Sequence, residues 1–363
     1  MFVVFIEADE ESKNCSLFNC EYPAKAINKV PGHKAEVYTI TEFNQHTERI
    51  QKSCMEADLI IVERNLFGDT LPTMMWFKVR SKILAVTYDD AYDLMESSNV
   101  AHAFWIKSQI IQPNEKGEMQ VINISPSPLE QFKWGLRESA GIICPSRILA
   151  DDWNMYAKTY RTHNYILPER YENAVPLFAH DSKELYIGWS GSMSHYKSFT
   201  DSGIAGALTY VVRKYPHVTI LMTGDRRVYD RINVPEGRKK YSNYVPDDQY
   251  GNLLKSFDLG LAPLSGEYDR RRSWIKVLEY AFLKIPWVAT NYETYEELGE
   301  YGTLTENGLE NWKNSLCDAI ENIDQKRELA NGKAYDFAMA NTWDRNVGKL
   351  LSMYQEIINS KYQ

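Results

Sequence analysis

Cysteine is scarce in this chain of 363 residues, and its spacing leaves no paired set of thiols. The five cysteines are Cys15, Cys20, Cys54, Cys144 and Cys317, and none of them belongs to a Cys-x-x-Cys pair. An odd number without such spacing is typical of reduced thiols. A Cys15–Cys20 disulfide has no other support in the sequence. We therefore expect a cytoplasmic protein.

Long apolar runs and a surplus of positive charge are also missing. No run is long enough to span a bilayer, and residues 1–7 are too short and not basic enough for a signal peptide. Lysine and arginine number 41 against 49 aspartates and glutamates, which gives a formal net charge of −8. Such a chain gains little from general attraction to nucleic acid or anionic membranes, although a local basic patch can still bind either.

Several enzyme motifs are absent as well. The sequence has no Gly-x-Ser-x-Gly elbow, no His-Glu-x-x-His pair, no P-loop and no paired Cys/His metal set. These absences exclude the corresponding hydrolase, metalloprotease and P-loop classes. The stretch around residues 22–25 lacks a Gly-x-Gly-x-x-Gly fingerprint, which disfavours a dinucleotide-dependent oxidoreductase.

The first half alternates short apolar runs with helix-like segments, the pattern of a parallel sheet covered on both faces. Residues 102–127 lack this alternation and are interpreted as an insertion or mobile loop, with a turn at 113–117. We expect strands at 2–6, 35–40, 57–62, 83–88, 141–146 and 164–168, and helices at 22–29, 45–55, 71–81, 128–139 and 147–158.

The second half repeats the alternation after a polar stretch at 169–183, which we interpret as an interdomain linker. Two doubly wound α/β domains in tandem place a cleft between the carboxyl ends of their sheets. The tail from Trp312 is expected to be helical and amphipathic. We expect strands at 185–189, 218–222, 259–262 and 287–290, and helices at 198–214, 247–256 and 273–284.

Arg272, Lys276 and Glu279 share one face of the helix expected from Ser273, because they are spaced i, i+4 and i+7. An anion would relieve the repulsion between the two cations and the positive end of the helix dipole. Glu279 can accept hydrogen bonds from vicinal hydroxyls. The alternative is a Lys276–Glu279 ion pair on a solvated face. With the loop at Pro263 and a glycine turn at 188–192, we favour a nucleotide-sugar site.

The glycine turn at 188–192 follows the first strand of the second half and precedes a helix. Backbone N–H groups of such a turn can bind an anion, although many glycine turns only close a βα loop. His195 and Lys197 follow within reach of the same anion. The alternative for His195 is an ordinary polar loop residue.

Acidic residues end two strands of the first half on the side of the cleft. Tyr88, Asp89 and Asp90 end the fourth strand, and Glu63 and Arg64 end the third. Carboxylates at this edge can bind substrate hydroxyls or assist proton removal. The alternatives are helix N-capping by the two aspartates and a surface turn for the other pair. No set of partner ligands supports a metal site.

The chain resembles the retaining "group 1" branch of the GT-B glycosyltransferases. Three stretches carry the resemblance over nearly the whole chain. They are residues 187–195; residues 261–290 with Ser273, Lys276 and Glu279-Tyr280-Ala281; and residues 57–64 together with Tyr88-Asp89-Asp90 and Cys144-Pro145-Ser146. The resemblance implies Rossmann-like domains at 1–172 and 173–340, and a helix at 341–363 that returns to the first domain.

The resemblance also implies a role for each part of the site. The second domain would bind the nucleotide-sugar, with Glu279 on the ribose and Arg272, Ser273 and Lys276 on the diphosphate. Donor contacts are further expected from Gly191, Ser192, His195, Lys197, Tyr244 and Val245. The first domain would bind the acceptor through Glu63, Arg64 and Tyr88, with Asp89 and Asp90 joining Arg272 and Lys276 in catalysis.

Three positions depart from the pattern of that family. Arg271 stands where the family often has a second glutamate, eight residues before Glu279. Lys284 replaces the usual glycine before Ile285-Pro286. No clear catalytic histidine follows the acidic turn of the first domain. Which residue would make the sugar contacts of that missing carboxylate is therefore an open question.

The resulting prediction is a glycosyltransferase that needs no metal and no cofactor beyond its nucleotide-sugar. The leaving diphosphate would be stabilised by Arg272 and Lys276, and the acceptor would be a hydroxyl of a glycan or of a lipid-linked precursor. Two alternatives stay open. Arg226-Arg227 and 270–272 could meet the backbone of DNA that carries hydroxymethylated bases, although the acidic total argues against it. The other alternative is a scaffold protein that binds a nucleotide-sugar but does not catalyse a reaction.

Overall fold

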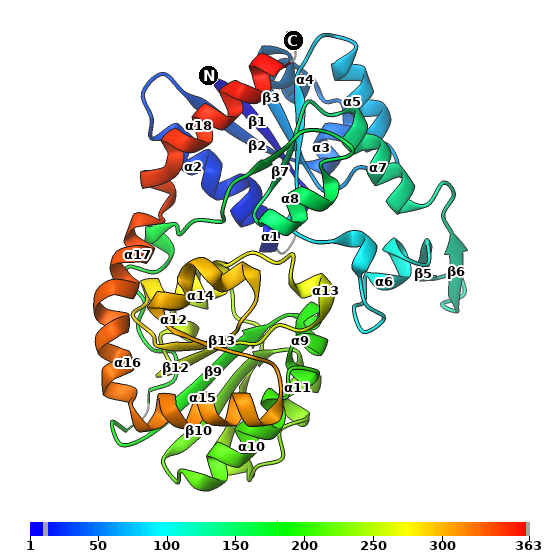
Figure 1. Ribbon diagram of the computed structural model, residues 1–363. Helices are drawn as coiled ribbons and strands as arrows, with labels where there is room; N and C mark the ends of the chain where they lie inside the picture. Colours follow the sequence, from blue (N-terminus) through cyan, green and yellow to red (C-terminus); the bar gives the residue numbers. More distant parts are fainter. Residues whose placement is uncertain (10–13, 180, 361–363) are drawn as a thin grey trace.

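The computed structural model describes residues 1–9, 14–179 and 181–360. Two six-stranded parallel sheets, each flanked by helices, form the two halves of the molecule (Figure 1). The first has the order β2-β1-β3-β4-β7-β8 and the second β11-β10-β9-β12-β13-β14. This is the predicted fold class, two doubly wound Rossmann-like domains.

The strands of the first sheet are β1 (Phe2–Glu7), β2 (Lys34–Thr39), β3 (Leu59–Glu63), β4 (Leu84–Thr87), β7 (Ile142–Cys144) and β8 (Thr159–Arg161). Its helices are α1 (Asn14–Ser16), α2 (Tyr22–Asn28), α3 (Ile40–Gln45), α4 (Glu48–Glu56), α5 (Thr70–Lys78), α7 (Pro128–Glu138) and α8 (Arg147–Trp153). Side chains of β1 alternate between two cores. Val3 and Phe5 pack in one and Val4 and Ile6 in the other, because both faces of the sheet are covered.

The strands of the second sheet are β9 (Leu185–Gly191), β10 (Val218–Gly224), β11 (Lys239–Ser242), β12 (Leu259–Ala262), β13 (Trp287–Thr290) and β14 (Thr303–Thr305). Its helices are α9 (Tyr196–Thr200), α10 (Ile204–Lys214), α11 (Arg226–Asp230), α12 (Asp247–Leu254), α13 (Gly266–Asp269), α14 (Ile275–Phe282) and α15 (Leu309–Glu321). The helix expected at 198–214 is interrupted before α10, where Gly203 has a φ of +89°.

The sixth expected strand of the first half, 164–168, is wrong. The last strand is β8, at 159–161, and Ile166 forms only an isolated bridge to Thr342. The stretch is apolar because it packs under the returning tail, where Tyr165 and Trp343 meet with ring centroids 5.1 Å apart. Strands β11 and β14 were not expected, since both are short edge strands without an apolar run.

Residues 102–127 are more ordered than their sequence suggests. They form α6 (His102–Trp105) and an antiparallel hairpin of β5 (Gln109–Pro113) and β6 (Met119–Asn123). The expected turn is present, and the N–H of Asn114 donates to the carbonyl oxygen of Glu118 at 2.8 Å. Figure 1 shows the hairpin projecting from the first domain.

The C-terminal tail returns to the first domain, as the resemblance implies. It runs through α16 (Ile323–Leu329) and α17 (Tyr335–Ala340) to α18 (Trp343–Ser360), which packs on α2 (Figure 1). Tyr354 of α18 lies 6.3 Å, ring to ring, from Phe5 of β1. The two halves are thus tied by the tail and by the segment that joins their sheets. In the described part of the chain, no helix is long and apolar enough to cross a bilayer.

Both sheets direct their carboxyl ends toward the junction of the two halves. In the second sheet the strand order reverses between β9 and β12, and in the first between β1 and β3. Ligands of doubly wound sheets bind outside the carboxyl ends at such a reversal. A ligand is therefore expected beside the residues that follow β9 and β12 on one side and β1, β3 and β4 on the other.

Truncation of Trp343 should weaken the return of the tail. Its ring is 1% exposed at the start of α18. We expect Trp343→Ala to lower the free energy of unfolding by about 3–5 kcal/mol, because a large buried side chain is lost and a cavity remains. Urea denaturation followed by circular dichroism measures the change. Trp134→Ala, at a residue 52% exposed, is the matched control and should change little; equal losses in both variants would contradict the assignment.

Candidate functional site

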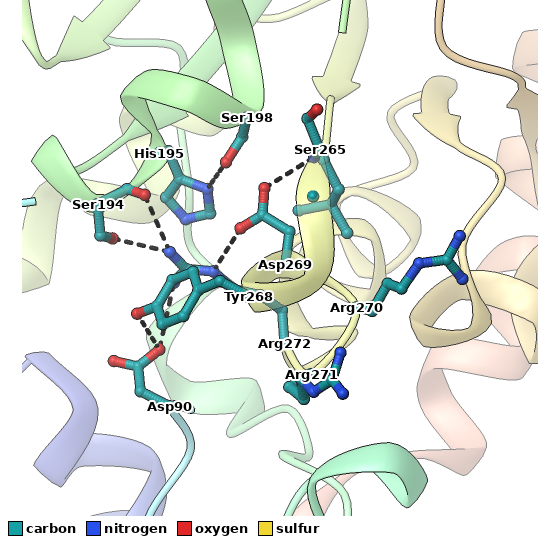
Figure 2. A network of polar contacts seen from close by, with 12 residues as sticks. Asp90, Ser194, His195, Ser198, Ser265, Tyr268, Asp269, Arg270, Arg271 and Arg272 are labelled. Atoms are coloured by element: carbon teal, nitrogen blue, oxygen red, sulfur yellow. Dashed lines mark hydrogen bonds and ion pairs between the residues drawn. The ribbon is translucent and has the colours of Figure 1, made fainter. Parts of the chain in front are cut away.

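Arg272 lies in the turn before α14 and contacts three separate segments (Figure 2). Its Nε donates to Asp269 Oδ1 at 3.1 Å, and its Nη2 donates to the backbone oxygen and Oγ of Ser194 at 3.2 and 3.0 Å. Its Nη1 lies 3.6 Å from Asp90 Oδ1 of the first domain. Burial on its own would lower the pKa of Arg272, but Tyr268, Asp90 and Asp269 hold it above its ordinary value. The site therefore keeps a fixed positive charge.

Lys276 lies in the first turn of α14, and its Nζ donates to the backbone oxygen of Ser190 near the end of β9. Burial lowers its pKa to about 8, with Arg272 adding to the decrease and Glu279 opposing it. Two cations thus meet at the glycine turn. A site that weakens the charged form of a lysine in this way is suited to an anion, which would restore that charge.

Glu279 is 4% exposed and is not part of a solvated ion pair. Its Oε1 accepts a hydrogen bond from Tyr171 Oη at 2.5 Å and lies 3.5 Å from Arg170 Nη1. Burial raises the pKa of this carboxyl, against the lowering effect of Arg170. The alternative of a Lys276–Glu279 pair on an exposed face is therefore wrong.

Arg170 and Tyr171 are site residues that the sequence did not reveal. They lie in the polar stretch that we interpret as a linker, and no spacing relates them to Glu279, which is more than a hundred residues away. Arg170 also pairs with Asp247, and its guanidinium lies 4.8 Å from the ring centroid of Tyr250.

The glycine turn after β9 brings its expected residues together. A Cβ on Gly191 would approach the Trp189 ring to 2.3 Å, so packing already requires glycine there. Ser192 is exposed, and its Oγ lies 2.8 Å from Ser194 Oγ. Burial lowers the pKa of His195 well below its ordinary value, and Arg272 and Lys276 add to this. Its imidazole is therefore neutral at pH 7 and lies 3.4 Å from Ser198 Oγ.

The other expected donor residues are more dispersed. Lys197 pairs with Glu96 of the first domain at 3.4 Å. Ser273 Oγ accepts hydrogen bonds from the N–H of Ile275, the first residue of α14, at 3.2 Å and from Asn164 Nδ2 at 3.1 Å, so it links the start of α14 to the first half of the chain. Tyr244 is exposed and Val245 half-buried, in the loop that follows β11.

Asp90 reaches across the cleft from the end of β4. Its Oδ1 accepts a hydrogen bond from Tyr268 Oη at 2.7 Å and faces Arg272 (Figure 2). The helical turn that follows begins at Tyr92 and has Ala91 as its N-cap. The N-cap alternative for Asp89 and Asp90 is therefore wrong.

The surroundings of Asp89 disfavour the ionised form of its carboxyl group. Its Oδ1 is buried and has no hydrogen-bond partner among the described residues. Burial raises its pKa to about 7; Asp90 and Glu63 contribute to the increase and Arg64 opposes it. A carboxyl with such a pKa can exchange a proton near neutral pH.

Two of the three expected acceptor residues do not face the cleft. Tyr88 is fully buried, with its ring centroid 5.1 Å from that of Phe132. Glu63 is fully buried as well and accepts hydrogen bonds from Ser16 Oγ, from Asn19 Nδ2 at 3.1 Å and from the N–H of Ala8 at 2.8 Å. Neither side chain can contact an acceptor directly, which corrects the expectation.

Arg64 is the third expected acceptor residue, and it is partly exposed. Its guanidinium pairs with Asp9 and lies 3.9 Å from Glu63 Oε1. Its φ of +29° is unusual for a residue with a side chain and is held by this crowded turn. The surface-turn alternative therefore does not fit Glu63 and Arg64.

Two residues of the loop before α14 were not expected to take part. Asp269 is buried, accepts from the N–H of Ser265 at 2.8 Å and fixes Arg272. The guanidinium of Arg272 also lies over the ring of Tyr268, 4.8 Å from the ring centroid. Arg271, at the family's glutamate position, points away from Arg272 (Figure 2). Its guanidinium pairs with Asp152 and Glu267, both at 2.7 Å. The described residues contain no group of three or more His, Cys, Asp or Glu arranged to hold a metal ion.

The raised pKa of Asp89 predicts a pH-dependent effect on stability. The folded protein holds this proton up to about pH 7, whereas the unfolded chain releases it near pH 4. The free energy of unfolding of the wild-type protein therefore falls as the pH rises from about 4 to about 7. We expect Asp89→Asn to gain on the order of 1–3 kcal/mol relative to wild type between pH 4 and 7, measured by urea denaturation. The exposed Asp69→Asn is the control, and a gap that does not change with pH would contradict the prediction.

Comparison with known proteins supports the fold but gives no close relative. No protein-family model and no curated protein matches the chain. The Anabaena protein Alr3699/HepE, solved with UDP and glucose, has a TM-score of 0.61 at 15% identity, over 97% of this chain and 100% of its own. Sucrose-phosphate synthase (tll1590) of Thermosynechococcus elongatus has a TM-score of 0.65 at 10% identity, over 99% and 100%. S. aureus TarM reaches 0.59 at 14% identity, over 87% of this chain and 58% of its own. The chain therefore has the GT-B fold, with the arrangement of these similar structures.

Proposed function

We propose that this protein is a glycosyltransferase that moves a sugar from a nucleoside-diphosphate sugar to an acceptor hydroxyl with retention. The observation that carries the proposal is the meeting of Arg272 and Lys276 at the carboxyl end of β9, with Glu279 one turn further along α14. Two half-buried cations fit a diphosphate, and the carboxylate fits the ribose hydroxyls beside it.

The proposed reaction breaks the bond between the anomeric carbon and a diphosphate oxygen, and both electrons stay on that oxygen. Arg272 and Lys276 oppose the charge that develops there. The acceptor oxygen forms the new bond from the face that the diphosphate leaves, and its proton passes to the departing phosphate. His195 is neutral and can donate one hydrogen bond to the same group. This route requires neither a nucleophile from the protein nor a bound metal.

Uridine is the proposed base of the donor. HepE was solved with UDP-glucose as well as with UDP. The G117R mutant of TarM was solved with fondaparinux, α-GlcNAc-glycerol and UDP, and S. aureus MnaA, with a TM-score of 0.53, was solved with UDP. In this chain the ring of Tyr244, in the loop after β11, is exposed, and we infer that it stacks on the base.

DNA as an acceptor is not favoured by the arginines that first suggested it. Arg270 pairs with Glu293, and Arg271 pairs with Asp152 and Glu267. Arg226 pairs with Asp230, and Arg227 pairs with Asp225. These guanidinium groups are compensated within the chain, so they do not form a basic stripe for a phosphate backbone.

Loss of the Glu279 carboxylate should weaken donor use. We expect Glu279→Gln to reduce kcat/KM for the UDP-sugar about 10- to 100-fold, because hydrogen bonds to a charged group are lost. Release of the matching nucleoside diphosphate from UDP-, GDP- and ADP-sugars measures this, with the exposed Glu328→Gln as control. Full activity of Glu279→Gln would overturn the site. No turnover by wild type, together with thermal stabilisation by UDP, would indicate a binding protein instead.

Binding of a diphosphate should draw a proton onto Lys276. Its pKa is about 8 in the free protein, facing Arg272, Glu279, Asp269 and His195. A nearby dianion raises that pKa, so at pH 8 we expect uptake of about half a proton per UDP bound. Calorimetry in buffers of different ionisation enthalpy measures the uptake. It should vanish in Lys276→Met, and equal uptake in both proteins would contradict the assignment.

A further inference from the structure

The hairpin of β5 and β6 is a part of the first domain that the proposed donor site does not use. It is anchored through α6, where Trp105 is 6% exposed and stacks on Tyr92 with the ring centroids 4.2 Å apart. The strands themselves project away from the domain (Figure 1). The hairpin is therefore held at its base and presents its strands to the surroundings of the molecule.

Apolar side chains cover one face of the hairpin. Ile111 opposes Val121, and Pro113 opposes Met119, across the two strands. These four side chains share a face because the side chains of a strand alternate, and Ile111, Val121 and Met119 are 53%, 56% and 66% exposed. A hairpin without further strands is marginally stable in water, and an exposed apolar patch is typical of an interaction surface. A partner that covers this hairpin would therefore stabilise it.

The outer edge of β6 carries backbone groups that no strand in the described part of the chain pairs, because the sheet consists of β5 and β6 alone. The N–H of Asn114 donates to the carbonyl oxygen of Glu118, so these two residues form a hydrogen-bonded pair of the ladder. Such pairs alternate with pairs whose backbone groups point outward. The N–H and C=O groups of Met119, Val121 and Asn123 therefore point away from β5.

This edge lacks the features that normally prevent strands from pairing. Exposed edge strands are usually protected by charged residues, proline or a bulge. In the hairpin β5 has Pro113 at its end and lies against α6. In contrast β6, with the sequence Met-Gln-Val-Ile-Asn, has neither a charge nor a proline. The open edge of β6 is therefore suited to accept another strand.

A membrane surface fits the hairpin poorly. Residues 107–123 contain two lysines and two glutamates, so the segment has no net charge to attract anionic lipids. In hydrocarbon the open edge of β6 would leave its backbone N–H and C=O groups without partners, which is costly. The edge therefore favours a partner that supplies a strand.

A second copy of β6 satisfies the edge completely. Antiparallel pairing about a two-fold axis at Val121 places Val121 opposite its own copy and Met119 opposite Asn123 of the second copy. Each outward N–H then donates to an outward carbonyl oxygen, and no charged residues meet, because residues 119–123 are uncharged. The same register keeps Ile111 and Val121 of both copies on one face, where they form a continuous apolar stripe of cross-strand neighbours.

We propose that the open edge of β6 pairs with β6 of a second copy of this chain, which joins two hairpins into a four-stranded antiparallel sheet and the two chains into a homodimer. This inference does not depend on the proposed function. A strand pair of five residues is smaller than a standard interface of about 1,200–2,000 Å², so the dimer is reversible, with a Kd in the micromolar range.

Sedimentation velocity of the full-length protein, from about 1 to 200 μM in 0.15 M salt, tests the proposal. The average mass of the wild type should rise from that of one chain toward that of two. Val121→Lys places two ammonium groups directly opposite each other and should weaken the dimer at least about tenfold. Ile111→Lys is the matched control, on the same face and similarly exposed. Its ammonium group lies three strand spacings, about 14 Å, from its copy, so the dimer should weaken less than about threefold.

Oxidative cross-linking gives an independent readout of the register. The Cα atoms of a hydrogen-bonded antiparallel pair are about 5.5 Å apart, within reach of a disulfide. Val121→Cys should therefore form a covalent dimer, whereas Ile111→Cys should behave like the wild type, which controls for the native cysteines. A wild type that stays monomeric at 200 μM, equal weakening by the two lysine variants, or equal cross-linking of the two cysteine variants would overturn the inference. Monomeric protein that floats with phosphatidylcholine vesicles would assign the apolar face to a membrane and would also overturn it.

Discussion

The compensation of one guanidinium, that of the half-buried Arg272, is the constraint on which the cleft depends. Its partners come from the turn before α14, from the glycine turn after β9 and from the first domain, through Asp269, Ser194 and Asp90. A buried charge that loses a partner is strongly destabilising. The three segments are therefore held in one arrangement, and donor groups that are distant in sequence are fixed before any ligand arrives.

A second guanidinium, that of the half-buried Arg170, helps to position the carboxylate of the proposed donor site. Arg170 lies near the rings of Tyr22 from the first domain and Tyr250 from the second, and with Tyr171 it holds Glu279. These two residues belong to the segment that joins the sheets. The position of Glu279 is thus coupled to the geometry between the domains, so a change in that geometry alters the donor site as well as the width of the cleft.

The sequence predicted the parts of this arrangement that depend on local spacing. Arg272, Lys276 and Glu279 meet at β9 because helix periodicity aligns them, and most strands were found because buried parallel strands are short apolar runs. Pairs such as Tyr171–Glu279 depend on tertiary packing, which one sequence does not encode locally. Tyr88 was misplaced because side chains of a strand alternate in direction, and a run buried on both faces gives no polar alternation to show which of them turns inward. Lys284, at the family's glycine position, keeps a φ of +60°, so a substitution that looked like a departure preserves the backbone.

The two walls of the cleft carry opposite charge, and this asymmetry matters for more than binding. Under the proposed function, cleavage moves electrons from the anomeric carbon toward the diphosphate. Arg272 and Lys276 lie on the side that gains negative charge, and Asp90 lies on the side left with positive charge on the sugar. The electric field between the two walls therefore favours charge separation in the direction in which the bond breaks. Because Arg272 is held by Asp269, Ser194 and Asp90, its charge needs little reorganisation during the reaction.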